Sequence, residues 1–160
     1  MIVWRITKAR YASVALNGQG ARLYGTRWTR PGKAVVSTST TLSLSALEYL
    51  VHLDVDLVPK DLISIEIAIA DGAPTHAIEA EKLPKDWRAY PAPELLGDLG
   101  DRWHSQGRYL LLSVPSAVIP NERNILINPA HPNFKRSVRM VKAEPFAFDD
   151  RLTSSRKKIR

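Results

Sequence analysis

The stretch GTRWTRPGKAVVSTSTTLSLSALEYLVHL, residues 25–53, decides how the rest of the chain is organised. It begins with a turn marked by Pro31-Gly32, and the β-branched residues that follow predict a short strand over residues 35–37. A helix is expected next, over residues 41–53, because apolar residues recur there at helical spacing. Its candidate N-caps are Ser39, Thr40 and Thr41. Apolar side chains cover more than half of its circumference, so this helix is expected to be largely interior.

One carboxylate, Glu48, lies in the middle of this apolar helix. Leu44, Leu47 and Val51 are near it at helical spacing, so a fully exposed position is not expected. An ionised carboxylate beside apolar surface is costly unless something binds it. Glu48 falls at the edge of the apolar arc, where it can face a cleft, and it is the first candidate functional residue. The commoner alternative is that such a residue pairs with a nearby Arg or Lys.

Length and composition limit the class of protein. A chain of 160 residues with 44% hydrophobic residues can bury one sizeable core, which predicts one domain over residues 1–152 and a basic tail over residues 153–160. No apolar run reaches the roughly 18 residues of a membrane span, and Arg5 and Lys8 interrupt the apolar start that a signal peptide needs. We therefore expect a cytoplasmic protein without a membrane partner.

The residues that usually bind metals are scarce. The absence of cysteine excludes disulfides, thiolate zinc sites and cysteine nucleophiles. The four histidines show no paired spacing of the kind found in metal sites, so no metal is expected.

The net charge of +7 and the pI near 9.9 are typical of proteins that bind nucleic acid. The charge is uneven, however, because residues 156–160 (RKKIR) hold four of the basic side chains. Such a basic end is more often simply solvated. A non-catalytic nucleic-acid-binding module that uses this tail remains an alternative of a different class.

The remaining elements read mainly as strands. Residues 62–70 (LISIEIAIA) alternate cleanly, and residues 109–114 (YLLLSV) form a continuous apolar run typical of a central buried strand. Further strands are expected over residues 2–6, 77–80, 124–127 and 138–143. Together, the predicted strands and helices indicate an α+β fold, with a mixed or antiparallel β core and flanking helices.

Two further helices complete the prediction. Thr7 is expected to cap a short helix over residues 8–16, which Gly18 and Gly20 then end. A helix over residues 95–106 is expected to be weakened by two internal residues, Gly97 and Gly100. The Pro-rich and charged residues 81–94 predict a loop before it.

Common phosphate-binding and hydrolase motifs, such as GxxxxGK[ST], GxGxxG, GxSxG and HExxH, are absent from the sequence. Several blocks in a fixed order instead resemble the RES domain family, named for its Arg, Glu and Ser. These blocks are Gly25–Trp28, Ala46–Leu53, Val114–Phe134 and Phe148–Leu152. The resemblance spans almost the whole chain.

The resemblance implies a fold like that of the ADP-ribosyltransferases and a role as the toxin of a bacterial toxin–antitoxin pair. The implied partner is an Xre-type helix-turn-helix antitoxin, in a homodimer or a toxin–antitoxin hetero-oligomer. NAD is implied as a substrate, not as a bound cofactor, and it would be degraded at the nicotinamide–ribose bond. Transfer of ADP-ribose to a protein is the alternative reaction.

Residues of the matched blocks suit this chemistry, and we assign Arg27, Glu48 and Ser116 as the catalytic set. Cleavage of nicotinamide passes through an oxocarbenium-like ribose, which a carboxylate such as Glu48 stabilises. A guanidinium holds phosphate oxygens in a bidentate manner, which favours Arg27 as the pyrophosphate ligand. The rival arginines are Arg5 and Arg30. Arg27 alternatively stacks on Trp28 or forms an ion pair.

Ser116 follows a predicted buried strand, where its hydroxyl can bind ribose or phosphate, and Ser113 competes for this role. A purely structural alternative is that Ser116 caps a turn. Asn124 is a further candidate for binding the substrate. A loop-tying role is the commoner one for it, and also for Asn128 and His131.

One position departs from the family pattern. Members of the family usually have a Tyr where this chain has Ser37, and a serine cannot stack on the rings of NAD. Ser37 can instead hydrogen-bond ribose, which with Arg27 and Glu48 resembles the Arg, Ser, Glu set of another branch of ADP-ribosyltransferases. Tyr24 or Tyr49 is a candidate for the missing ring.

Overall fold

The computed structural model describes residues 1–53 and 58–153. Its described strands form one sheet in the order β4-β5-β6-β2-β1-β3-β7. The strands are β1 (Ile2–Lys8), β2 (Val36–Ser39), β3 (Leu62–Ile69), β4 (Thr75–Ala77), β5 (Leu111–Pro115), β6 (Arg123–Ile127) and β7 (Val138–Phe146). The helices are α1 (Gln19–Tyr24), α2 (Leu42–Leu50), α3 (Glu94–Gln106), α4 (Phe134–Ser137) and α5 (Asp150–Thr153), with 3₁₀ turns η1 (Ala9–Val14) and η3 (Ala80–Lys82). Among the described strands β4 and β5 pair in parallel and the other pairs are antiparallel.

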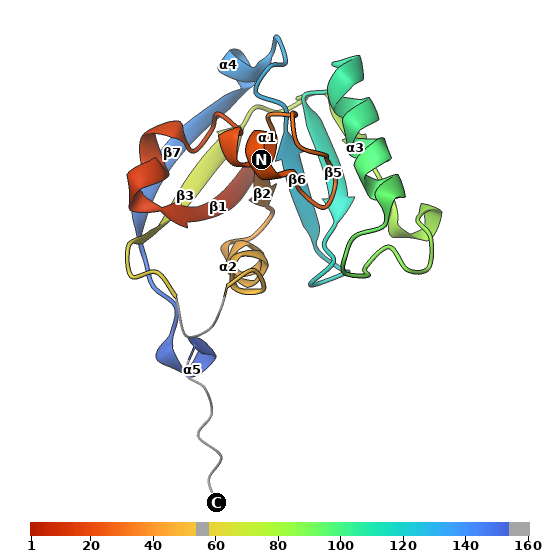
Figure 1. Cartoon of the computed structure of the whole chain (residues 1–160). Helices are drawn as coiled ribbons and strands as arrows, with labels where there is room; N and C mark the ends of the chain where they lie inside the picture. Colours follow the sequence, from red (N-terminus) through yellow and green to blue (C-terminus); the bar gives the residue numbers. More distant parts are fainter. Residues whose placement is uncertain (54–57, 154–160) are drawn as a thin grey trace, which may run out of the picture.

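The sheet opens into two wings between β1 and β2, which pair at a single position, Trp4 opposite Ser39. Figure 1 shows β7, β3 and β1 on one side and β2, β6 and β5 on the other, with α2 below the gap between them. Apolar residues of both wings form the first core. They include Val3, Ile65, Ile67, Val36, Leu111 and Ile127. The clean alternation of residues 62–69 therefore buries one face of β3 in this core, as predicted.

The second core lies between α3 and the β5–β6 side of the sheet (Figure 1). Three tryptophans dominate it, namely Trp28, Trp87 and Trp103, and they pack with Leu96 of α3 and with Leu112, Val114 and Leu126 of the sheet. β5 is buried along its whole length and has a neighbour on each side, as expected for the YLLLSV run.

The helix α2 confirms the predicted position of the central helix but is shorter, because it ends at Leu50. Thr41 is its N-cap, since the Oγ1 atom accepts a hydrogen bond of 3.0 Å from the backbone N–H of Leu44. The same hydroxyl donates to the Glu122 carboxylate at 2.8 Å. The helix is less interior than its composition predicts, because Leu44 is fully buried but Leu47 and Leu50 are only partly buried.

Two predictions for the early part of the chain are wrong. The helix over residues 8–16 is only the 3₁₀ turn η1, and Thr7 belongs to β1 instead of capping it. Gly18 does not end a helix; it precedes α1, with φ of 69°. A side chain at Gly18 would place its Cβ 2.5 Å from the backbone N of Val35, so the glycine permits both the turn and a close backbone approach.

The later elements follow the prediction with shifted bounds. The strand expected over residues 77–80 is β4, Thr75–Ala77, and the strand expected over residues 138–143 continues to Phe146. The predicted helix over residues 95–106 is α3. Residues 154–160 of the predicted basic tail lie outside the described residues. In the described ranges, no helix has the length and apolar character needed to span a membrane.

Candidate functional site

The carboxylate of Glu48 is held by uncharged donors. Ser116 Oγ donates to Oε1 at 2.7 Å, and the Asn124 side-chain amide donates to the same oxygen. None of the ion pairs found among the described residues involves Glu48, so the structure does not support pairing with an Arg or Lys. Oε2 receives no hydrogen bond from the described residues and is not a buried atom. Within the described ranges, Glu48 therefore keeps one oxygen without a hydrogen bond.

Ser116 is fully buried directly after β5, and its hydroxyl is saturated. It donates to Glu48 and accepts hydrogen bonds of 3.0 Å each from the backbone N–H groups of Val118 and Ile119. A serine hydroxyl has one proton and two lone pairs, so no capacity is left for a ribose or phosphate. Ser116 thus caps a turn and donates to Glu48, which disfavours it as a direct ligand of the substrate.

Asn124 lies in β6 opposite Ser39 of β2. Its Oδ1 accepts a hydrogen bond of 2.7 Å from Ser39 Oγ, while its Nδ2 donates to Glu48. From the sequence, Ser39 is a candidate helix cap and part of the STS segment, residues 37–39, that is expected to support the site. The available signal was the period of two along VSTS, which directs Ser37 and Ser39 to the same face of β2.

Arg27 is held in place by the loop that precedes the α3 helix. Its Nη1 donates to the backbone carbonyls of Trp87, at 2.9 Å, and Ala89, at 3.0 Å. Burial lowers the pKa of the Arg27 guanidinium, and the negative charge of Glu48 raises it. The Glu48 carboxylate therefore favours the charged form of the Arg27 guanidinium. Neither alternative for Arg27, stacking on Trp28 or forming an ion pair, is found in the described residues.

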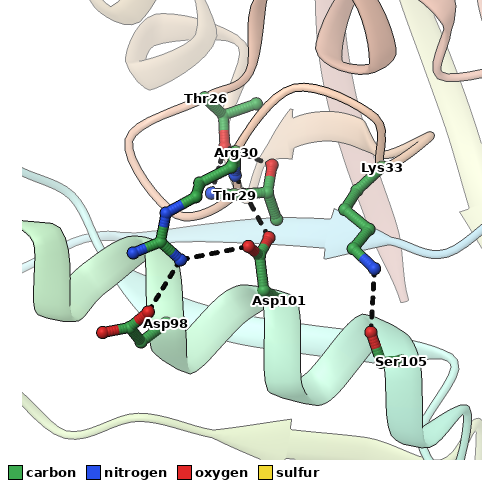
Figure 2. Close-up of polar contacts among 7 residues, drawn as sticks. All are labelled: Thr26, Thr29, Arg30, Lys33, Asp98, Asp101 and Ser105. Carbon is green, nitrogen blue, oxygen red and sulfur yellow. Dashed lines mark hydrogen bonds and ion pairs between the residues drawn. The ribbon is translucent and has the colours of Figure 1, made fainter.

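The turn that carries Arg27 is fixed to α3, as Figure 2 shows. Arg30 forms ion pairs with Asp98 at 2.7 Å and Asp101 at 3.2 Å, and its backbone N–H donates to Asp101. Lys33 donates to Ser105 at 2.9 Å, one turn further along the helix. Arg30 is therefore already paired, which disfavours it as a phosphate ligand.

Local hydrogen bonds shape the turn itself. Thr26 Oγ1 accepts from the backbone N–H groups of Trp28 and Thr29, both at 3.0 Å. Trp28 then packs near Trp87, with ring centroids 6.5 Å apart. A Cβ on Gly100 of α3 would lie 1.6 Å from the Trp28 carbonyl oxygen. Gly100 consequently allows the direct contact between helix and turn, a role that its helix-weakening character did not predict.

Arg5 has the least satisfied side chain in this region. Its Nη1 donates to the Ser37 carbonyl at 2.8 Å, but its Nε is buried without a partner. Burial lowers the pKa of the Arg5 guanidinium, and none of the ion pairs of the described residues includes it. An uncompensated buried cation is costly, so Arg5 remains a candidate for binding an anion. The Ser37 hydroxyl makes no hydrogen bond within the described ranges.

The other candidates have structural roles or lie apart. Ser113 Oγ accepts from Arg123 Nε at 2.7 Å, which disfavours it as a substrate ligand. Asn128 and His131 accept loop N–H groups, as predicted. Tyr49 stacks on Phe148, whereas Tyr24 is 84% exposed. In the described part of the chain, no group of three metal-ligating side chains gathers.

The blocks of sequence that resemble the RES domain family include the residues of this site. Glu48 and Ser116 come from different blocks, and the fold joins them by a hydrogen bond of 2.7 Å. The model of the RES domain family matches residues 2–149. The chain belongs to the RES domain family.

Similar proteins agree with this assignment. The RES chain is 34% identical over 157 residues to "Toxin Res" of Photorhabdus laumondii, covering 98% of this chain and 100% of the relative. It is 37% identical over 153 residues to the "Prs ADP-ribosylating toxin" of a Sphingobium strain, covering 93% and 94% of the two chains. The coarse function follows from these relatives: the chain is a toxin of the RES type.

The fold has a solved counterpart. A chain in the crystal structure of the M. tuberculosis MbcT–MbcA toxin–antitoxin complex superimposes with a TM-score of 0.73, covering 91% of this chain and 83% of that chain at 13% identity. This likeness confirms the predicted α+β class, a mixed sheet with flanking helices.

Proposed function

We propose that this RES toxin degrades NAD by cleaving the bond between nicotinamide and ribose. The observation that carries the proposal is the state of Glu48. Among the described residues, its Oε1 is held by two neutral donors, its Oε2 accepts no hydrogen bond, and its charge acts on the Arg27 guanidinium without a direct ion pair. A carboxylate that is oriented but not neutralised is suited to stabilise a positive charge that forms beside it.

In the proposed reaction, the bond between C1′ of ribose and N1 of nicotinamide breaks first. Its electron pair leaves with nicotinamide, which becomes neutral, and C1′ becomes an oxocarbenium-like centre. Glu48 Oε2 stabilises this centre and accepts a hydrogen bond from a ribose hydroxyl. A water oxygen then bonds to C1′ and releases a proton, which yields ADP-ribose.

The remaining assigned residues bind the rest of the dinucleotide. Arg27 holds the pyrophosphate, because its guanidinium is anchored at Nη1 and keeps its other nitrogens available. Arg5 is the second candidate for this anion. Ser37 has an unused hydroxyl on the same face of β2 as Ser39, so it can bind a ribose hydroxyl.

Nicotinamide release from NAD tests this function directly. Glu48→Gln keeps the size of the side chain and removes its charge, so we expect kcat to fall at least about 100-fold. Glu66→Gln is the matched control, because Glu66 is a partly buried carboxylate on β3 that already pairs with Lys142 at 3.7 Å. Wild-type release no faster than that of Glu48→Gln would defeat the proposal.

Transfer of ADP-ribose to a protein is the second candidate, because the Sphingobium relative is named an ADP-ribosylating toxin. The same cation would then be attacked by a side chain of the acceptor instead of water. Incubation with labelled NAD and an extract separates the two reactions, since transfer labels a protein band and hydrolysis labels only ADP-ribose. Binding to generic DNA that falls steeply with salt, without NAD turnover, would instead favour a nucleic-acid-binding module.

We propose a small Xre-type helix-turn-helix antitoxin as the partner, in a hetero-oligomer. The support is the family resemblance and the MbcT–MbcA structure, which is a toxin–antitoxin complex. Co-expression with the protein of the neighbouring reading frame, followed by size-exclusion chromatography with light scattering, tests this. A toxin that elutes unchanged beside that protein, alone or as a homodimer, would contradict the pairing.

A further inference from the structure

A chain of hydrogen bonds leads from β2 to the Glu48 carboxylate. Ser39 Oγ donates to Asn124 Oδ1 at 2.7 Å, and Asn124 Nδ2 donates to Glu48 Oε1. The carboxylate at the end of this chain determines which group donates in each hydrogen bond. A carboxylate only accepts, so the amide must turn its NH₂ group toward Glu48 and its carbonyl toward Ser39, which must then donate.

We propose that Ser39 and Asn124 form a positioning relay that determines which oxygen of Glu48 is presented to the substrate. This inference rests on the proposed function of Glu48 and adds a role for Ser39. With the relay in place, Oε1 is occupied by Asn124 and Ser116, and Oε2 is left for the ribosyl cation. The relay contains no charge, so it orients the carboxylate without neutralising it.

The backbone beneath the relay is rigid. Ser39 and Asn124 face each other in the β2–β6 ladder, and Ser39 is only 3% exposed. On either side of this pair, Thr38 Oγ1 donates to the Ile125 carbonyl at 2.7 Å, and the Thr40 backbone donates to the Arg123 carbonyl at 3.2 Å. The positions of the two relay side chains are therefore set by the sheet, while Glu48 is on a separate helix. The relay therefore connects α2 to the sheet through the carboxylate of Glu48.

The kinetic test is a double-mutant cycle on nicotinamide release. Ser39→Ala should lower kcat by about threefold to tenfold, the range of one hydrogen bond, with KM little changed. Asn124→Ala should lower kcat further. If Ser39 acts only through Asn124, adding Ser39→Ala to Asn124→Ala should change kcat by less than about twofold. Ser64→Ala is the control, because Ser64 is a buried strand serine whose hydroxyl makes no hydrogen bond in the described residues.

A second readout needs no enzymatic activity. In the ¹⁵N–¹H spectrum of the free protein, the side-chain NH₂ signals of Asn124 should shift in Glu48→Gln and also in Ser39→Ala, but not in Ser64→Ala. This outcome would support the relay even if NAD were not the substrate, which separates the two proposals. Unchanged NH₂ signals in Ser39→Ala, or losses of kcat that simply multiply in the double variant, would overturn the relay.

Discussion

Gly100 is the position where a single methyl group should most disturb the site. In α3 it lies directly against the turn that carries Arg27, and a Cβ built on it would be 1.6 Å from the Trp28 carbonyl oxygen and 2.7 Å from the Trp28 carbonyl carbon. Ordinary contacts of this kind are about 3.4 Å, so Gly100→Ala requires the helix and the turn to separate by about 1.5–2 Å. Backbone atoms, not a flexible side chain, are what must move.

Separating the helix from the turn has two costs in unfolding free energy. Forcing an extra carbon into a packed contact costs about 1–3 kcal/mol, and loss of the hydrogen bond from the Arg30 N–H to Asp101 costs about 1 kcal/mol more. The better helix propensity of alanine offsets about 1 kcal/mol. The net loss is about 1–3 kcal/mol, which corresponds to a decrease in Tm of roughly 2–12 °C for a chain of this size.

Urea unfolding and calorimetry of Gly100→Ala and Gly97→Ala measure this. Gly97 is in the same helix, but its added Cβ would meet only the Arg30 side chain at 3.6 Å, so alanine there should be neutral or stabilise by up to about 1 kcal/mol. Gly100→Ala should also raise KM for NAD, because the displaced turn moves Arg27. If both variants were equally stable, the contact between α3 and the turn would not have the role assigned to it.

Three further changes have defined outcomes. Burial lowers the pKa of His104 below its ordinary 6.5, despite a hydrogen bond of 3.1 Å to the Ala34 carbonyl. The unfolded chain therefore binds a proton at His104 more readily than the folded chain does. The contribution of neutral His104 to the unfolding free energy is present above about pH 6.5 and is lost as the pH falls. Urea unfolding of the wild type should consequently weaken more between pH 7 and pH 5 than that of His104→Gln, and equal slopes would contradict this. Thr41→Ala should cost about 1 kcal/mol by removing the N-cap of α2, whereas Thr41→Ser should not. Arg5→Met should leave the unfolding free energy within about 1 kcal/mol, because the guanidinium lacks an ion pair, and should raise KM for NAD about tenfold; a much larger loss of stability would make Arg5 structural instead.

Local patterns predicted the elements that depend on neighbouring residues. The alternation of isoleucines predicted β3, and the hydroxyl residues before the central helix included its actual cap, Thr41. The early helix failed because Thr7 continues β1, where pairing with β3 outweighs its capping tendency. Gly97 and Gly100 looked equivalent in the sequence, yet only Gly100 has backbone atoms against it. No local rule reports that difference, because it depends on another segment.

By itself, the sequence determined that Glu48 is an unusual carboxylate in an apolar helix and that it belongs to the blocks of the RES family. Only the tertiary structure decided what holds it. Ser116 and Asn124 are 68 and 76 positions further along the chain, and they reach Glu48 through the register of β2, β5 and β6. Helical spacing and capping act over a few residues and can be read from the sequence, but sheet register joins distant segments. Ser116 and Asn124 therefore contact the Glu48 carboxylate through the sheet register, and Ser39 is joined to it through Asn124.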